Sequence, residues 1–189
     1  MNKKLIYGGI IVGLLLAGAI VFIVNSQQTR QLNALEDKFP GWTQISGKLM
    51  SFRARFPNEP TYATQDLPVP DSEVILKQEL YTTEDNGSVY TISAMVYPSD
   101  IQGDEAENLR TALNGMVQAA RGATLVSQEM HSTPTGKNYL EFTIKKEDHF
   151  FKGRLFVSTR TLVQAFVEYS EQSFDNDAYA YFVGSLDIE

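Results

Sequence analysis

Residues 5–24 contain no charged residue, no amide side chain and no proline, and most of them are Leu, Ile, Val, Ala or Gly. A helix rises about 1.5 Å per residue, so a helix over this segment would extend roughly 30 Å, the thickness of the hydrocarbon core of a bilayer. A helix also satisfies its own backbone hydrogen bonds, which lipid cannot do. The sequence therefore predicts a transmembrane helix over 5–24, and this helix constrains how the rest of the chain is placed.

A cleaved signal peptide is the alternative interpretation of the same segment, because it also begins with basic residues followed by an apolar core. That core usually has about 7 to 15 residues and is shorter than the segment found here. The small-residue pattern Ala17-Gly18-Ala19 lies inside the apolar segment, so cleavage there would leave 20–24 as an apolar new N-terminus. We therefore expect an uncleaved membrane anchor.

Basic residues are distributed unequally around this segment. Lys3 and Lys4 precede it, whereas the first basic residue after it is Arg30. Because positive charge near a membrane span is retained on the cytoplasmic side, residues 1–4 are expected in the cytoplasm. The sequence thus predicts a single-pass protein of the cell inner membrane, with its C-terminal part outside the cytoplasm.

Small residues recur every four positions in the predicted span, at Gly9, Gly13 and Ala17. Such a stripe lets two helices approach closely in lipid, and it predicts self-association or contact with another membrane helix. The alternative is that the stripe reflects composition alone, since glycine is common in membrane spans.

The chain has no cysteine, so it has no disulfide, no thiolate nucleophile and no cysteine for a lipid anchor. Of its 16 basic residues, two precede the span, which leaves 14 against 23 acidic residues in the remainder. This acidic balance does not favour binding of nucleic acid, which requires basic patches. About 150 residues can bury enough apolar surface to fold without cross-links.

The segment 25–47 is predicted to be a linker with a short helix. Leu32, Leu35 and Phe39 have helical spacing, and they indicate either a continuation of the membrane helix or a short docking helix. Pro40-Gly41 should end this helix. Trp42 follows and is expected to cover the edge of the core, with a membrane or protein interface as the alternative.

Residues 48–189 are predicted to form an extracytoplasmic α+β domain. Alternation of apolar and polar residues indicates strands, with Asn86-Gly87 as a two-residue hairpin turn and 67–70 as a proline-marked loop. The strand over 88–97 has apolar residues on both faces, so we expect it to be covered on both sides. The expected strands are 49–56, 73–83, 88–97, 123–130, 138–146, 150–159 and 162–169.

Two helices are predicted in this domain. Asp104 and Glu107 form a capping pattern before an apolar stripe that Gly122 should end. Ser173 is the expected cap of the last helix. The buried stripe of the first helix is expected to comprise Leu109, Ala112, Leu113, Met116 and Ala120, and that of the last helix Phe174, Ala178, Tyr181, Phe182 and Leu186. The order of elements predicts an antiparallel sheet of about six or seven strands packed with two main helices.

Five segments within about 48–188 resemble bacterial extracytoplasmic domains of the PsbP-like fold. They are the strand entry Phe52-Arg-Ala-Arg-Phe-Pro-Asn-Glu-Pro60, the 81–97 hairpin, the helix end Ala119-Ala-Arg-Gly-Ala123, the 139–169 meander and the closing Tyr181-Phe-Val-Gly-Ser-Leu186. The photosynthetic members have an aromatic-rich start that this chain lacks. The resemblance implies a PsbP-like sandwich that acts as an accessory or assembly module without enzymatic chemistry.

Residues for catalysis or metal binding are sparse. His131 and His149 are the two histidines, and both lie in expected turns or strand ends, so we interpret them as surface residues. No nucleophile elbow, phosphate loop or histidine pair with metal spacing is present. An acidic cluster could bind a divalent cation but is better explained by helix capping. Its members are Asp100, Asp104, Glu105 and Glu107. The sequence thus predicts no catalytic residue, no metal and no cofactor, and an enzyme ranks third among the functions considered.

Aromatic residues are concentrated in the last quarter of the chain. Strand alternation places some of them opposite the core, so a partner surface or a small apolar groove is the hypothesis for Tyr139, Phe150, Phe151 and Tyr179. The alternative is that a second layer, either the segment 32–39 or the first helix, covers them. Two functions follow. The first is a membrane-anchored interaction module of an envelope protein complex, and the second is a domain that binds a small apolar or lipidic ligand.

Overall fold

The computed structural model describes residues 32–68, 73–133 and 135–188 of the 189-residue chain. The predicted span over 5–24, with its stripe of Gly9, Gly13 and Ala17, lies outside these residues. Within the described ranges, no helix is both long enough and apolar enough to cross a membrane.

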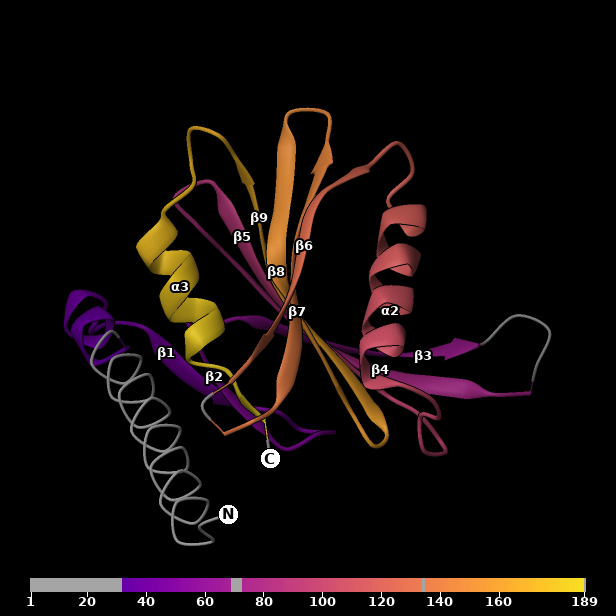
Figure 1. The fold of residues 1–189 in the computed structure, drawn as a ribbon. Helices are drawn as coiled ribbons and strands as arrows, with labels where there is room; N and C mark the ends of the chain where they lie inside the picture. Colours follow the sequence, from indigo (N-terminus) through magenta and orange to yellow (C-terminus); the bar gives the residue numbers. More distant parts are fainter. Residues whose placement is uncertain (1–31, 69–72, 134, 189) are drawn as a thin grey trace, which may run out of the picture.

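The described residues form an α+β fold with a seven-stranded antiparallel sheet, a smaller sheet and three helices (Figure 1). The spatial order of the large sheet is β3-β4-β5-β9-β8-β7-β6, and that of the small sheet is β1-β2-β10. The helices are 32–38, α2 (Glu105–Ala119) and α3 (Asn176–Gly184). The strands are β1 (Thr43–Ser46), β2 (Phe52–Phe56), β3 (Thr61–Pro68), β4 (Ile75–Asp85), β5 (Ser88–Val96), β6 (Thr124–Ser132), β7 (Asn138–Lys146), β8 (His149–Ser158), β9 (Thr161–Ser170) and β10 (Asp187–Ile188).

Local sequence explains the predicted turns and caps. Asn86 and Gly87 have φ angles of 50° and 74°, as a two-residue primed turn requires, and they join β4 to β5 as predicted. The Asp104 carboxylate accepts the backbone N–H of Glu107, which confirms the capping pattern before α2. The second capping prediction is wrong, because Asp175 caps α3 and Ser173 instead bonds to Ser170 and Ser88.

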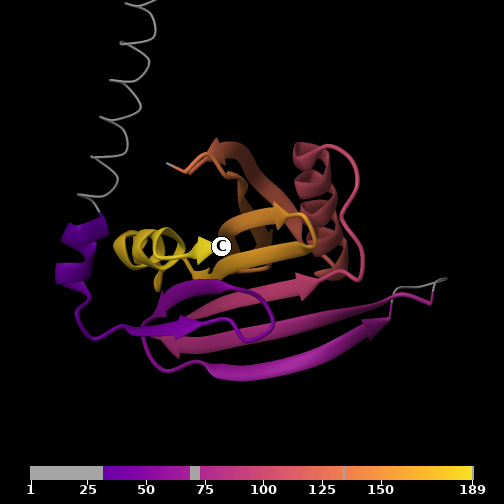
Figure 2. The same ribbon diagram turned by 90° about the horizontal axis from the view of Figure 1, so that it is seen from below.

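The large sheet is covered on opposite faces by different elements, as Figure 2 shows for strands β6–β9 between α3 and α2. On one face, α3 and the small sheet enclose the larger core, which includes Phe52, Phe56 and Phe182. On the other face, α2 packs its buried Leu109 and Leu113 against β7 and β8. These two leucines belong to the predicted stripe, so the helical periodicity identified the packed side correctly.

Three strands differ from the sequence-based prediction. Residues 61–68 form β3, although the sequence predicted a loop through 67–70 and no strand between residues 57 and 66. Both faces of β3 are largely exposed, so its sequence lacks the apolar alternation that marks a half-buried strand. β1 and β10 are short and pair with β2. The pairing of β10 joins residues that are distant in the sequence. The segment 25–47 therefore contributes β1 to the folded domain.

The strand predicted over 88–97 is buried or half-buried on both faces, but the two faces differ in character. Tyr90, Ile92 and Ala94 belong to the larger core. The other face presents Thr91 and Ser93, which are buried among neighbouring side chains of the sheet, and α2 does not extend over it within the described residues. A polar face of this kind is typical of an antiparallel sheet with one side open.

Candidate interaction surface

The aromatic residues predicted to form a partner surface do not lie on one surface. Tyr139 and Tyr179 are 7% and 4% exposed and belong to the larger core. Phe150 and Phe151 are adjacent in β8, so their side chains point to opposite faces, toward the larger core and the α2 core respectively. Of the second layer expected as the alternative, the first helix, α2, packs over Phe151. Tyr139 and Phe150 instead lie in the larger core with α3, the helix that carries Tyr179.

Charged side chains accompany these aromatics on the α3 side of the sheet. Arg154 donates from Nε to the Glu141 carboxylate at 3.1 Å, and its guanidinium lies over the ring of Tyr139. Burial, reinforced by the charge of Glu141, raises the pKa of Tyr179 well above its ordinary value. The Tyr179 hydroxyl makes no hydrogen bond of normal geometry within the described residues, although Glu141 is close enough to act on it. This cluster is thus a half-buried part of the packing between α3 and the sheet.

The histidines and the acidic cluster have separate structural roles. His149 Nδ1 lies 3.2 Å from the Glu168 carboxylate, and His131 stacks on the ring of Tyr139. In the acidic cluster, Asp104 caps α2 and Glu105 accepts a hydrogen bond from Asn138. Among the described residues, no group of three or more His, Asp or Glu side chains could hold a metal ion.

The pockets among the described residues are small or polar. A pocket of about 210 Å³ lies beside helix 32–38 and α3, and Leu32, Phe156 and Lys137 are among its lining residues. This volume is below the roughly 300 to 1,000 Å³ of typical ligand pockets. A hollow of about 580 Å³ lies at the turns after β7 and β9, and most of its lining is charged or polar. Neither pocket combines an apolar interior with converging polar groups.

The segment that follows the predicted anchor is packed onto the domain. Lys38 forms an ion pair with Asp177 of α3 at 2.6 Å, and Glu36 forms one with Arg55 of β2 at 2.6 Å. Phe39 stacks on Tyr181, with ring centroids 5.6 Å apart. Ion pairs at such exposed positions contribute little individually, so the aromatic packing fixes the segment. A helix is thus observed over 32–38, where Leu32 and Leu35 predicted one. Whether it continues the predicted membrane helix concerns residues outside the described ranges.

Trp42 completes this aromatic cluster at the edge of the larger core, as predicted. Its ring lies 5.1 Å from that of Tyr181, 5.2 Å from that of Phe39 and 5.7 Å from that of Tyr90. The cluster joins helix 32–38, α3 and β5.

Glu79 is a buried carboxylate that sequence reasoning missed. It is 0% exposed and accepts the backbone N–H groups of Lys48, Leu49 and Met50 at 2.9 to 3.2 Å, as well as the Tyr81 hydroxyl at 3.1 Å. A buried carboxylate is stable only when its oxygens are hydrogen-bonded in this way. Glu79 therefore fixes the loop between β1 and β2. Its only signal in the sequence was an acidic residue at the inward-facing position of a strand.

The two edges of the large sheet differ in how they are protected. β6 is interrupted by a bulge between Leu125 and Ser127, which breaks the regular edge. β3 pairs with β4 without interruption from Thr61 to Pro68, and its other edge has no neighbouring strand in the described residues. A long regular edge of this kind can accept another strand.

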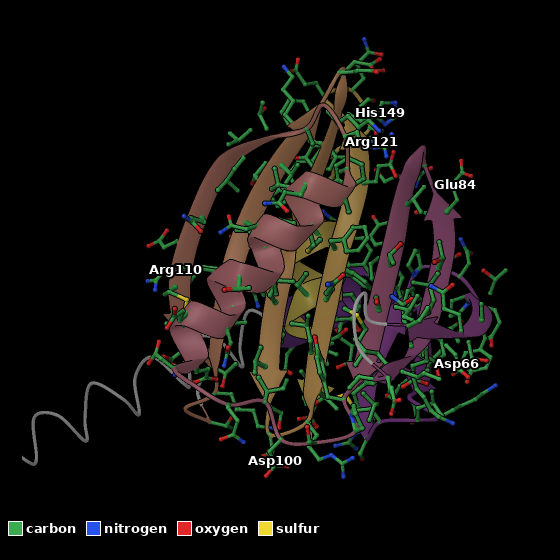
Figure 3. All side chains as sticks on the ribbon, turned by 90° about the vertical axis from the view of Figure 1, so that its right-hand side faces the viewer. Asp66, Glu84, Asp100, Arg110, Arg121 and His149 are labelled. Atoms are coloured by element: carbon green, nitrogen blue, oxygen red, sulfur yellow. The ribbon has the colours of Figure 1, made fainter. Side chains whose placement is uncertain are left out.

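The face of the sheet next to this edge is also open. Figure 3 shows α2 over one half of the sheet, while the strands that carry Asp66 and Glu84 lie beside it with no described helix over them. Half-buried residues of this face include Leu80 and Gln78, and Gln78 donates to the Ser93 hydroxyl at 2.6 Å. The edge of β3 and this mixed face form the candidate interaction surface.

Comparison of the chain with family models and with curated protein sequences found no match to either.

Proposed function

We propose that this chain is a membrane-anchored, extracytoplasmic interaction module of an envelope protein complex, without catalytic chemistry of its own. The proposal retains the transmembrane helix over 5–24, the orientation predicted by Lys3 and Lys4, and the PsbP-like sandwich suggested by the resemblance.

The observation that carries this proposal is the docking of 32–42 onto α3 and β2. Only seven residues separate the predicted span from the first described residue, Leu32. A chain of seven residues extends at most about 25 Å. The domain would therefore be held near the membrane by a packed connection and not by a long flexible tether. A fixed position suits a module that presents one surface to a neighbouring envelope protein.

The pairing of charged side chains within the fold also supports an interaction module rather than an enzyme. The buried Glu79 and the half-buried Glu141 and Arg154 are hydrogen-bonded or paired within the fold. The alternative of a small apolar or lipidic ligand depends on the 210 Å³ pocket beside Leu32, which is small for a complete ligand.

The absence of cysteine allows a direct test of topology with single introduced cysteines. Gln128 is exposed on β6, so Gln128→Cys should react with a membrane-impermeant maleimide in intact spheroplasts. Asn2→Cys is the matched control and should react only after the membrane is permeabilised. Labelling of Asn2→Cys, but not Gln128→Cys, in intact spheroplasts would contradict the proposed orientation.

Association is tested by cross-linking in intact cells, followed by isolation of the full chain in mild detergent. We expect envelope proteins or further copies of this chain to be isolated, with Phe39→Ala reducing the yield because it releases the docked segment. Recovery of a stoichiometric lipid without any protein would support the ligand-binding alternative instead.

A further inference from the structure

We propose that strand β3 binds β3 of a second copy of this chain, in an antiparallel register centred on Thr64. This inference identifies the partner of the interaction module and therefore rests on the proposed function. It joins two seven-stranded sheets into one continuous sheet across a twofold axis.

The backbone of β3 is suited to this pairing. The strand runs through eight residues without a bulge, and its side chains are exposed on both faces except for the half-buried Leu67. Every second residue of an edge strand directs its N–H and C=O groups away from the sheet, where another strand can bind them. The edge also lacks lysine, one of the residues that commonly prevent such pairing.

Symmetry restricts the possible registers. A twofold axis perpendicular to the sheet places the same face of both copies on the same side of the joined sheet. The axis then lies between two copies of one residue, which are directly opposite each other in the two strands. Near the middle of β3, the axis can therefore lie at Ala63, Thr64 or Gln65. An axis at Gln65 would place Pro68, which has no N–H group, opposite Tyr62. An axis at Ala63 would leave Leu67 outside the paired region. An axis at Thr64 pairs 61–67 completely and leaves Pro68 just beyond the last pair.

Charge complementarity favours the same register. Tyr62 is 38% exposed, and the Lys48 ammonium lies 3.8 Å from the centroid of its ring. With the axis at Thr64, Asp66 of the second copy lies opposite Tyr62 and hence beside Lys48. Within one chain, Asp66 of β3 is directly opposite Lys77 of β4, on the same face of the sheet as Tyr62. Each Asp66 would then lie between Lys77 of its own chain and Lys48 of the second copy, and the symmetry makes this contact twice.

Disulfide trapping tests the register directly. Thr64→Cys places equivalent cysteines on the axis, where cross-strand distances permit a disulfide. The full chain with Thr64→Cys should form a covalent dimer in its native membrane when copper phenanthroline and oxygen accept the two electrons. Ser127→Cys, an exposed small residue on the bulged β6 edge, is the matched control and should remain monomeric.

Charge exchange tests the recognition. In the Thr64→Cys background, Asp66→Lys should reduce the covalent dimer roughly five- to tenfold, because two favourable contacts become repulsive. Adding Lys48→Asp should restore most of the dimer. The backbone N–H of Lys48, and not its side chain, bonds to Glu79, so this exchange leaves that contact in place. Cooperative thermal unfolding of each variant shows that it is folded.

Equal trapping of Thr64→Cys and Ser127→Cys would overturn the proposal, because it would indicate random collision. Unchanged trapping in Asp66→Lys would overturn the register. Trapping of Thr64→Cys on a different envelope protein would reject the second copy as the partner while leaving the proposed function intact. Failure of the topology test, in contrast, would reject the proposed function itself.

Discussion

Single residues in this domain stabilise segments that are distant from them in the sequence. Glu79 is the clearest case, because one buried carboxylate binds three consecutive backbone N–H groups of the β1–β2 loop. Gly47 precedes this loop, and a Cβ atom there would overlap the Met50 carbonyl oxygen and the Phe52 ring. The loop geometry thus depends on an acid in β4 and on a glycine at its own start.

Glu79→Gln is expected to lower the free energy of unfolding by about 2 to 4 kcal/mol. The amide retains one oxygen but places an N–H donor where only acceptors fit. Urea denaturation measures the loss, and Glu84→Gln, at an exposed position on the same strand, should change the stability by less than about 0.5 kcal/mol. Equal stability of the two variants would show that the Glu79 contacts contribute little.

Buried tyrosines predict how stability depends on alkaline pH. Burial raises the pKa of Tyr90 to about 12, whereas an unfolded tyrosine has a pKa of about 10. The folded state therefore holds this proton more tightly. The resulting stabilisation is complete below about pH 10 and is lost as the pH rises toward about 12. Urea unfolding midpoints should fall over this range, and less steeply in Tyr90→Phe. An unchanged slope in Tyr90→Phe would contradict this role of Tyr90.

At the scale of elements, the large sheet depends on a close approach of strands at Gly153. A Cβ atom at this position in β8 would overlap the Ala165 carbonyl oxygen and the Cβ of Phe166 in β9. Gly153 pairs with Phe142 on one side and Phe166 on the other, so the aromatic side chains of the α2 core fill the space above it. Glycine is therefore required here by packing and not by a turn.

Gly153→Ala should destabilise the domain by about 1 to 3 kcal/mol, because the backbone of β9 must shift to admit the methyl group. Gly115→Ala is the opposite case, since nothing lies within 4 Å of its added Cβ on the exposed side of α2. This second variant should gain about 0.5 to 1 kcal/mol from helix propensity. Thermal unfolding of both variants compares the two effects, and a stabilised Gly153→Ala would contradict the packing described.

At the scale of the whole molecule, the aromatic cluster of Phe39, Trp42 and Tyr181 packs the first described segment onto the domain. Helix 32–38 lies against α3, and β1 follows it directly into the small sheet. Residues 32–42 are thus continuous with the core of the domain.

Because Trp42 is the only tryptophan in the chain, its fluorescence reports on this connection. Phe39→Ala should shift the emission to longer wavelength and increase quenching by acrylamide, since the half-buried indole loses one of its covering rings. Tyr62→Ala removes an aromatic ring in β3, outside this cluster, and should leave both properties unchanged. Identical quenching in the two variants would show that the segment is not docked in solution.

Local patterns in the sequence were sufficient for most elements of the large sheet. Asn86-Gly87 identified a hairpin because its backbone angles are required by the turn alone, and Asp104 identified the start of α2 because capping involves residues three positions apart. The meander β7–β8–β9 was predicted because its strands alternate and are joined by short turns. Each of these features depends on interactions within a few residues of the chain.

Only the tertiary structure decided which predicted faces became buried and which edge remained open. Tyr139 and Tyr179 are core residues because α3 returns over the sheet, and the sequence does not indicate where a terminal helix will lie. β3 was missed because an edge strand exposed on both faces has no apolar alternation to reveal it. Glu79 gained its role from a loop about thirty residues earlier. Local periodicity is recorded in the sequence, whereas burial, edge exposure and long-range hydrogen bonds are set by which elements meet when the chain folds.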